Sequence, residues 1–264
     1  MPLLEHLREL KNRLIKSAIG IVLGAIAGWF LYDPVLEALQ EPVRQISEHT
    51  GGTASVNFGS IASPFDFKLQ LSILIGIVVS SPVWIYQVWA FVLPGLTRKE
   101  RRYTLGYMAA GVPLFLAGVW VGWLVTPQVV RALTQFTPEG FSNIIDGRDY
   151  VDFVTRMLLF LGFAFLVPVL LVAVNAIGLV SGKAILKAWR ITVFLVFVLA
   201  AIAAPGADAL SMFMLAGPLL VLFFAAIGIC LLNDRRRERR DAKRTAEAEA
   251  GADTATSRED LEKF

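Results

Sequence analysis

Residues that could ligate a metal or form a disulfide are scarce in this sequence. Its 264 residues include one cysteine and two histidines. The single cysteine, Cys230, excludes an internal disulfide and a cysteine metal cluster, and the apolar run around it indicates inert packing. Because only His6 and His49 remain, we do not expect histidine ligation of zinc or haem, and we predict no cofactor.

The sequence patterns of common enzymes are absent as well. There is no HExxH zinc motif, no GxSxG elbow with a partner histidine, no Walker loop and no pair of aspartates within an apolar run. We therefore predict that the chain is not an enzyme.

Long apolar blocks make up most of the chain instead. Hydrophobic residues account for 56% of it, and the mean hydropathy is +0.61, which is typical of a chain whose solvent is lipid. A helix that crosses a bilayer needs about 20 mostly apolar residues. Such runs lie at residues 17–36, 69–93, 105–125, 157–180, 191–204 and 209–232. The short fifth run is either a re-entrant segment or a short span joined to the sixth by a turn at residues 205–208.

Basic residues decide between these alternatives, because cytoplasmic connections retain lysine and arginine. Connections rich in basic residues alternate with connections poor in them. The rich ones are residues 8–16, 98–102 and 183–190 and the tail, which has seven basic residues between Arg235 and Arg244. A re-entrant fifth run would place that tail outside. We therefore predict an all-α membrane protein of six transmembrane helices, with the last two spans short and both termini cytoplasmic.

The segments outside the spans are predicted less sharply. We expect the long outer connections, residues 37–68 and 127–155, to form short helices that cap the outer face. Behind a membrane domain of residues 1–232, the charged residues 233–264 are expected to be solvated helix or disorder, and we assign them as a disordered tail. Kinks are predicted at four prolines within the spans, Pro82, Pro113, Pro168 and Pro218.

Two carboxylates on the cytoplasmic side could bind a cationic ligand. Glu9 lies on the polar side of an amphipathic segment whose leucines, at positions 3, 7, 10 and 14, would lie along the interface or the bundle. Glu100 is the one carboxylate among four cations. The simpler interpretation is an i,i+4 pair of Glu9 with Arg13 and, at Glu100, reduced charge repulsion. Alternatively, both carboxylates meet and bind two arginines, since guanidinium–carboxylate pairing is bidentate. Spacing leaves both open.

Two polar residues stand out within or beside the apolar runs. Gln87 lies well inside the second run, and Asp208 lies at the outer turn. A carboxylate close to lipid is costly, which favours a functional role for Asp208. It could equally cap the sixth helix, because aspartate at a helix N-terminus accepts from free N–H groups.

Motifs spread over nearly the whole chain, residues 4–232, carry a family resemblance. They are residues 6–14 (HLRELKNRL), 63–68 (SPFDFK), 81–96 (SPVWIYQVWAFVLPGL), 99–102 (KERR), 136–140 (FTPEG) and 150–153 (YVDF), with Pro205 and Asp208 in the last turn. In order and in loop placement they resemble TatC, the receptor subunit of the twin-arginine protein translocase.

The resemblance implies a cupped six-helix bundle in the cytoplasmic membrane that binds signal peptides bearing an Arg-Arg motif. It also implies single-span partners of the TatA/TatB type, self-association, passage of folded proteins driven by the proton-motive force, and no catalytic step or nucleic-acid partner. The implied signal-peptide contacts are Glu9, Glu100, Lys11, Arg13, Phe91 and Leu96. The implied groove or partner-helix residues are Pro82, Gln87, Asp208 and Met212.

The chain departs from the family pattern in two places. The family commonly has a glutamate in the fourth span where this chain has Leu166, so the bundle interior lacks that carboxylate. Ala204 and Met212 stand where polar residues occur near the start of the last spans. A small-solute or ion transporter is the competing hypothesis, but it would need paired charges or broken helices near the midplane.

Overall fold

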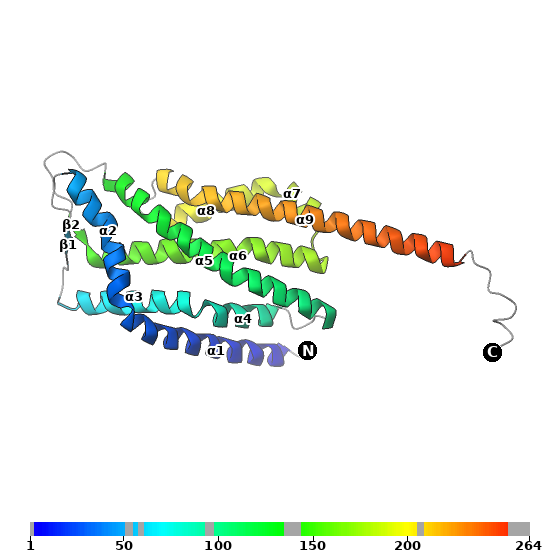
Figure 1. The fold of residues 1–264 in the computed structure, drawn as a ribbon, viewed down its shortest axis with the longest axis horizontal. Coiled ribbons are helices and arrows are strands. Elements are labelled where there is room, and N and C mark those ends of the chain that lie inside the picture. Colours follow the sequence, from blue (N-terminus) through cyan, green and yellow to red (C-terminus); the bar gives the residue numbers. More distant parts are fainter. Residues whose placement is uncertain are drawn as a thin grey trace.

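Helices account for nearly all of the structure. The computed structural model describes residues 3–50, 55–57, 61–92, 98–134, 144–204 and 209–252. The helices are α1 (Leu3–Phe30), α2 (Tyr32–Thr50), α3 (Ser63–Val79), α4 (Ser81–Val92), α5 (Arg98–Thr134), α6 (Gly147–Ile177), α7 (Gly182–Lys187), α8 (Trp189–Ala203) and α9 (Ala209–Ala252). The strands are β1 (Ser55–Asn57) and β2 (Ile144–Asp146). Figure 1 shows the long helices lying side by side along one direction.

All six predicted runs form helices, but not all are full-length spans. Four helical segments are long and apolar enough to cross a membrane: Leu4–Phe30, Ala109–Ala132, Gly147–Ile177 and Ala209–Glu249. The pair of α3 and α4 is a fifth candidate, bent by 59°. The 15 residues of α8 are apolar but extend for only about 22 Å at 1.5 Å per residue.

The second predicted span is broken where Pro82 follows two serines. The Ser80 N–H donates to the Gly76 carbonyl at 2.9 Å and closes α3. Pro82 then takes the second position of α4, where its missing N–H costs no helical hydrogen bond. The kink predicted at Pro82 is confirmed. The other three prolines lie inside α5, α6 and α9, which continue through them.

Glycines let α1 and α3 approach backbone to backbone. A Cβ atom on Gly24 would lie 2.6 Å from the Gly76 carbonyl oxygen, and one on Gly28 would lie 2.5 Å from that of Ser72. Helices in lipid associate through such small-residue contacts, because lipid tails provide no hydrophobic drive between them. The sequence signal for this crossing is the spacing of four residues between Gly24 and Gly28.

One end of the bundle, here called the capped end, carries α2, β1 and β2. The Tyr150 hydroxyl donates to the Leu39 carbonyl of α2 at 2.8 Å. The strands pair in parallel, with Val56 opposite Ile145. The prediction of a helix in the first outer connection is confirmed by α2, which has 19 residues. In the second connection, the described residues belong to the end of α5, the strand β2 and the start of α6, so no separate short helix forms among them; residues 135–143 lie outside the described residues.

The opposite end, here called the basic end, gathers the first turns of α1 and α5, the helix α7 and the charged half of α9 (Figure 1). The connections predicted to be rich in lysine and arginine therefore meet on one side of the bundle. Helix α9 has 44 residues and projects beyond the other helices. Because α9 ends at Ala252, residues 233–252 of the tail are helical. Of the two predictions for this part of the tail, solvated helix or disorder, the structure has the helix.

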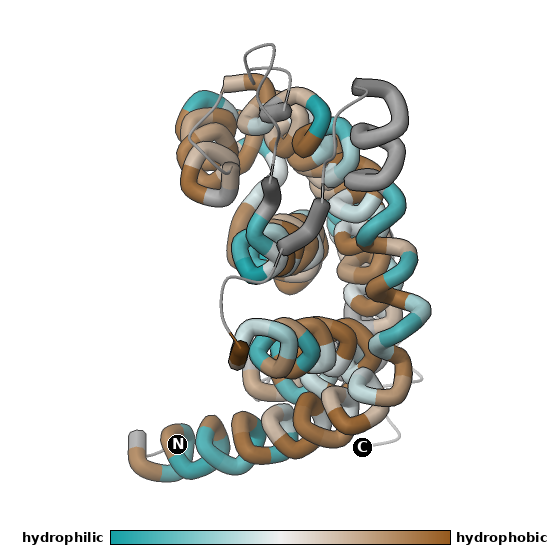
Figure 2. The backbone as a smooth tube through the Cα atoms, turned by 90° about the vertical axis from the view of Figure 1, so that its left-hand side faces the viewer, coloured by the Kyte–Doolittle hydropathy of each residue, from teal (hydrophilic) through white to brown (hydrophobic). Residues whose placement is uncertain are grey.

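The interior is apolar at the position where the family pattern has a glutamate. Leu166 packs against the buried residues Trp84, Ile85, Trp89, Phe115, Val169 and Ala173. Helix α1 lies at the edge of the bundle, with hydrophilic and hydrophobic residues alternating along its N-terminal turns (Figure 2). Only 11% of its most apolar window is buried, so most of that window is not covered by the rest of the described chain.

Candidate functional site

The first turns of α1 face the bundle with polar residues rather than with leucines. Leu4 and Leu14 are 80% and 66% exposed. The partly buried residues are instead His6, Glu9, Arg13 and Ser17, whose spacing of three or four residues places them on one helix face. Leu7 and Leu10 are exposed too, so the alternative that these leucines pack on the bundle is wrong for the described ones, and their contact with the membrane interface stays a prediction.

Glu9 holds a guanidinium in this structure. Arg13 donates from Nε at 2.9 Å and from Nη2 at 2.5 Å, and both bonds end on Oε1 of Glu9. The Oε2 atom therefore has no donor from the described residues. The two side chains are 27% and 24% exposed, so a ligand could reach the carboxylate from solvent. The predicted i,i+4 pair is confirmed, and the carboxylate retains room for a second cation.

Helix α4 supplies the wall beside this face of α1. The His6 ring stacks on the Phe91 ring, with centroids 4.5 Å apart and an interplanar angle of 20°. Two turns deeper along α4, Val83 Cγ1 lies 3.0 Å from where a Cβ of Gly20 would stand. Gln87 is four residues from both Val83 and Phe91, so it lies on the same face of α4, toward α1. The structure therefore brings Phe91 and Gln87 to the helix that carries Glu9.

The remaining predicted site residues are distributed as follows. Glu100 is the third residue of α5, which begins at the basic end, and its side chain lies outside the described residues. Leu96 and Asp208 lie outside the described residues altogether. Lys11 and Pro82 are exposed. Met212 is partly buried near the start of α9, away from the basic end, so it belongs to a different region from Glu9.

A second polar cluster at the basic end ties α9 to the end of α6 and the start of α7. The Asp234 carboxylate accepts from Asn175 Nδ2 at 2.8 Å and from the Gly182 N–H at 2.6 Å. The Ser181 hydroxyl caps α7 by accepting from the Ala184 N–H at 3.2 Å. These bonds fix where α7 sits against α9.

Sequence reasoning missed two contributors to this end of the molecule. His6 was considered only as a metal ligand, although its spacing from Glu9 and Arg13 places it on their face. The Asp234 cluster was missed because its partners are far apart in the chain. The available signal was a lone aspartate directly after the last apolar run.

Comparison with known proteins identifies the family. The family model described as "Sec-independent protein translocase protein (TatC)" matches residues 5–218, which run from the first turn of α1 to the tenth residue of α9. The chain belongs to the TatC family. TatC proteins are components of Sec-independent protein transport with several membrane helices, which agrees with the apolar bundle described above. This membership favours protein translocation over small-solute transport.

Individual relatives support the same assignment over nearly full lengths. The TatC protein of Rothia mucilaginosa is 48% identical over 266 residues, which cover 100% of this chain and 91% of the relative. The TatCy protein of Bacillus subtilis is 33% identical over 246 residues, covering 92% and 93%. A crystal structure described as the twin-arginine translocase receptor TatC in DDM superposes with a TM-score of 0.75 at 27% identity, covering 85% of this chain and 99% of that one.

Proposed function

We propose that this chain is the receptor and core subunit of a twin-arginine translocase, and that it binds signal peptides carrying two adjacent arginines at its basic end. The observation that supports this most is the Glu9 carboxylate. It lies on the inward face of α1, it is accessible, and it already accepts a guanidinium from Arg13. A peptide arginine would bind to Oε2 or take the place of Arg13.

The second arginine of the peptide binds Glu100. Helix α5 begins at Arg98, six residues after α4 ends at Val92, so Glu100 enters at the same end of the bundle as Glu9. Guanidinium–carboxylate pairs form two parallel N–H···O bonds and are more directional than pairs with lysine. Lys11 and Arg13 flank the first carboxylate, while Phe91 and Leu96 contribute the adjoining apolar surface.

The same proposal includes the orientation of the chain. The basic end faces the cytoplasm, because lysine and arginine are retained on that side of the membrane. Both termini are then cytoplasmic, and α8 counts as a short fifth span, which brings the total to six and locally thins the bilayer of the cytoplasmic membrane.

Partner helices bind the lipid-facing surfaces of the bundle. Phe213 is exposed on α9, and its ring contacts that of Phe197 on α8 at 5.5 Å. Single-span proteins of the TatA/TatB type pack here, beside Met212, with Asp208 as a further predicted contact, and Pro82 and Gln87 line the signal-peptide groove. With these partners and through self-association, the complex moves folded proteins using the proton-motive force, without a catalytic step.

Peptide binding tests this function directly. The purified chain in lipid nanodiscs is titrated with a fluorescent signal peptide carrying Arg-Arg, or with the same peptide carrying Lys-Lys. We expect the Arg-Arg peptide to bind at least about tenfold more tightly, since lysine keeps the charge but loses the bidentate geometry. Equal affinities for the two peptides would refute twin-arginine recognition by this chain.

A further inference from the structure

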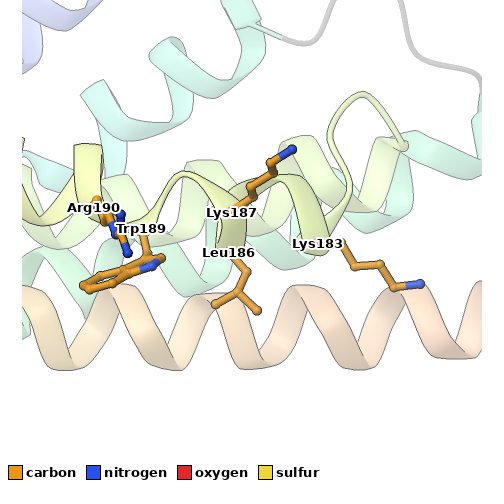
Figure 3. Close-up of a pocket in the computed structure, with 5 residues that line it drawn as sticks. All are labelled: Lys183, Leu186, Lys187, Trp189 and Arg190. Carbon is orange, nitrogen blue, oxygen red and sulfur yellow. The ribbon is translucent and has the colours of Figure 1, made fainter.

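A pocket lies at the basic end, where α7 meets α8, and the signal-peptide surface does not use it. It has a volume of 560 Å³ and is lined by Lys183, Leu186, Lys187, Trp189 and Arg190. In Figure 3 the three cationic side chains are spread along the segment rather than gathered at one point. Such a layout suits a headgroup held through several flexible contacts, and not a small ion enclosed by its ligands.

The charged residues that line this pocket are all cationic. None of the five described residues that line it is acidic. Lys183 makes an ion pair with Glu238 of α9 at 3.4 Å, but both side chains are mostly exposed, so this pair is weak. The Arg190 guanidinium lies over the Trp189 ring, 5.6 Å from its centroid, which orients it beside the pocket. Lys187 and Arg190 are therefore available to an anion.

An apolar surface continues directly from the pocket along α8. Phe194 and Ile202 are 66% and 77% exposed, and Ile191, Leu195 and Leu199 are exposed beside them. An exposed tryptophan, Trp189, stands at the boundary between the cations and this apolar surface. Tryptophan is enriched at the level of lipid headgroups. The order of cations, tryptophan and apolar surface matches the order of groups in an anionic phospholipid.

The position of the pocket is fixed by the rest of the fold. The Asp234 carboxylate on α9 accepts from the Gly182 N–H at 2.6 Å, and Ile185 is buried against α9 residues such as Phe223 and Ile227. These contacts hold α7 against α9. The α7 residues Lys183 and Lys187 therefore lie level with the point where the apolar part of α9 ends.

We propose that this pocket binds the phosphate of an anionic phospholipid, with Lys187 and Arg190 as the main cationic contacts and the acyl chains lying along α8. Basic pockets between membrane helices bind such headgroups by the same combination of charge and apolar contact. The site lies on α7 and α8 and does not depend on signal-peptide binding at Glu9.

Lipid retention measured by native mass spectrometry tests the site. The full chain is purified from nanodiscs that contain equal parts of phosphatidylglycerol and phosphatidylcholine, and is then delipidated stepwise. The wild-type chain should retain phosphatidylglycerol in preference. The variant Lys187→Gln/Arg190→Gln should retain about fivefold less of it.

The matched control is Lys243→Gln/Arg244→Gln on the projecting part of α9. It removes the same two residue types, both are exposed, and they lie about 16 Å beyond Leu232 along the helix, farther than a Debye length of about 8 Å. This control should retain phosphatidylglycerol like the wild type. The proposal would be overturned if both variants retained phosphatidylglycerol like the wild type, or if both lost it to the same extent.

Two further measurements separate a lipid from other anions and from misfolding. Soluble glycerol phosphate should not displace the bound lipid, because it lacks acyl chains. Displacement would overturn the lipid assignment in favour of a soluble phosphate. In the wild-type chain, phosphatidylglycerol but not phosphatidylcholine should protect Lys187 from amine acetylation, while Lys243 stays reactive. Full acetylation of Lys187 in phosphatidylglycerol would show that the lipid headgroup does not cover this amine and would also overturn the proposal.

Discussion

Gly24→Ala should lower the free energy of unfolding by about 1–3 kcal/mol, although alanine is the better helix former. The added Cβ would lie 2.6 Å from the Gly76 carbonyl oxygen and 3.1 Å from the Gly76 Cα. These are backbone atoms, so no side chain can rotate away, and α1 must separate from α3. Because α1 also carries Glu9, we expect signal-peptide binding to fall as well. Unfolding of the purified protein in mixed micelles measures the change.

Gly217→Ala is the matched control for this prediction. Gly217 is also within a membrane helix, α9, but a Cβ built there has nothing within 4 Å. The same atoms are added at no steric cost, so stability should be unchanged or slightly higher, by up to about 1 kcal/mol. If Gly24→Ala and Gly217→Ala unfold alike, α1 and α3 do not cross as closely as described here.

The double variant Glu9→Gln/Glu100→Gln should weaken binding of a twin-arginine signal peptide by about 100-fold or more. Glutamine preserves the shape of each side chain but removes its charge. A hydrogen bond to a charged group contributes about 1.5–3 kcal/mol, which corresponds to about tenfold or more in affinity for each site. In Glu9→Gln alone, Arg13 also loses its charged partner, so Arg13 is freed to repel the peptide arginine.

Glu5→Gln provides the control for the carboxylate variants. Glu5 lies one turn before Glu9 on α1, but it is exposed whereas Glu9 is partly buried. Glu5→Gln therefore changes the net charge by the same amount while leaving the Glu9–Arg13 pair intact. Peptide titrations should give wild-type affinity for Glu5→Gln. An equal loss in Glu5→Gln and Glu9→Gln would show that net charge, and not a specific carboxylate, governs binding.

Hydropathy predicted where helices form much better than where they end. The run predicted at residues 17–36 includes the end of α1 and the start of α2, because the chain breaks at Leu31. The apolar Leu36 packs on the buried cluster around Leu39 and Phe67 at the capped end, so it belongs to a protein core and not to a membrane span. An average over apolar residues does not separate those that face lipid from those that face a protein core.

The sequence alone could not predict which face of a helix meets the bundle, or which distant segments pair as strands. An amphipathic segment has two faces, and whether its leucines or its polar side meets the bundle depends on the neighbour. Here α4 offers Phe91, on which His6 stacks. The strand at residues 144–146 is three residues long and pairs with residues 55–57, far away in the chain, so no local pattern could reveal it. By contrast, Glu9 and Arg13 paired as predicted, because an i,i+4 contact is local.

The most direct test of the account is to map where the arginine pair of a bound signal peptide lies. A peptide with a photoreactive residue next to its Arg-Arg motif is crosslinked to the chain in membranes, and the adducts are located by mass spectrometry. We predict adducts in the first turns of α1 and α5, around Glu9 and Glu100, that are lost with a Lys-Lys peptide. Adducts at the capped end, or equal labelling by both peptides, would contradict the proposed receptor site.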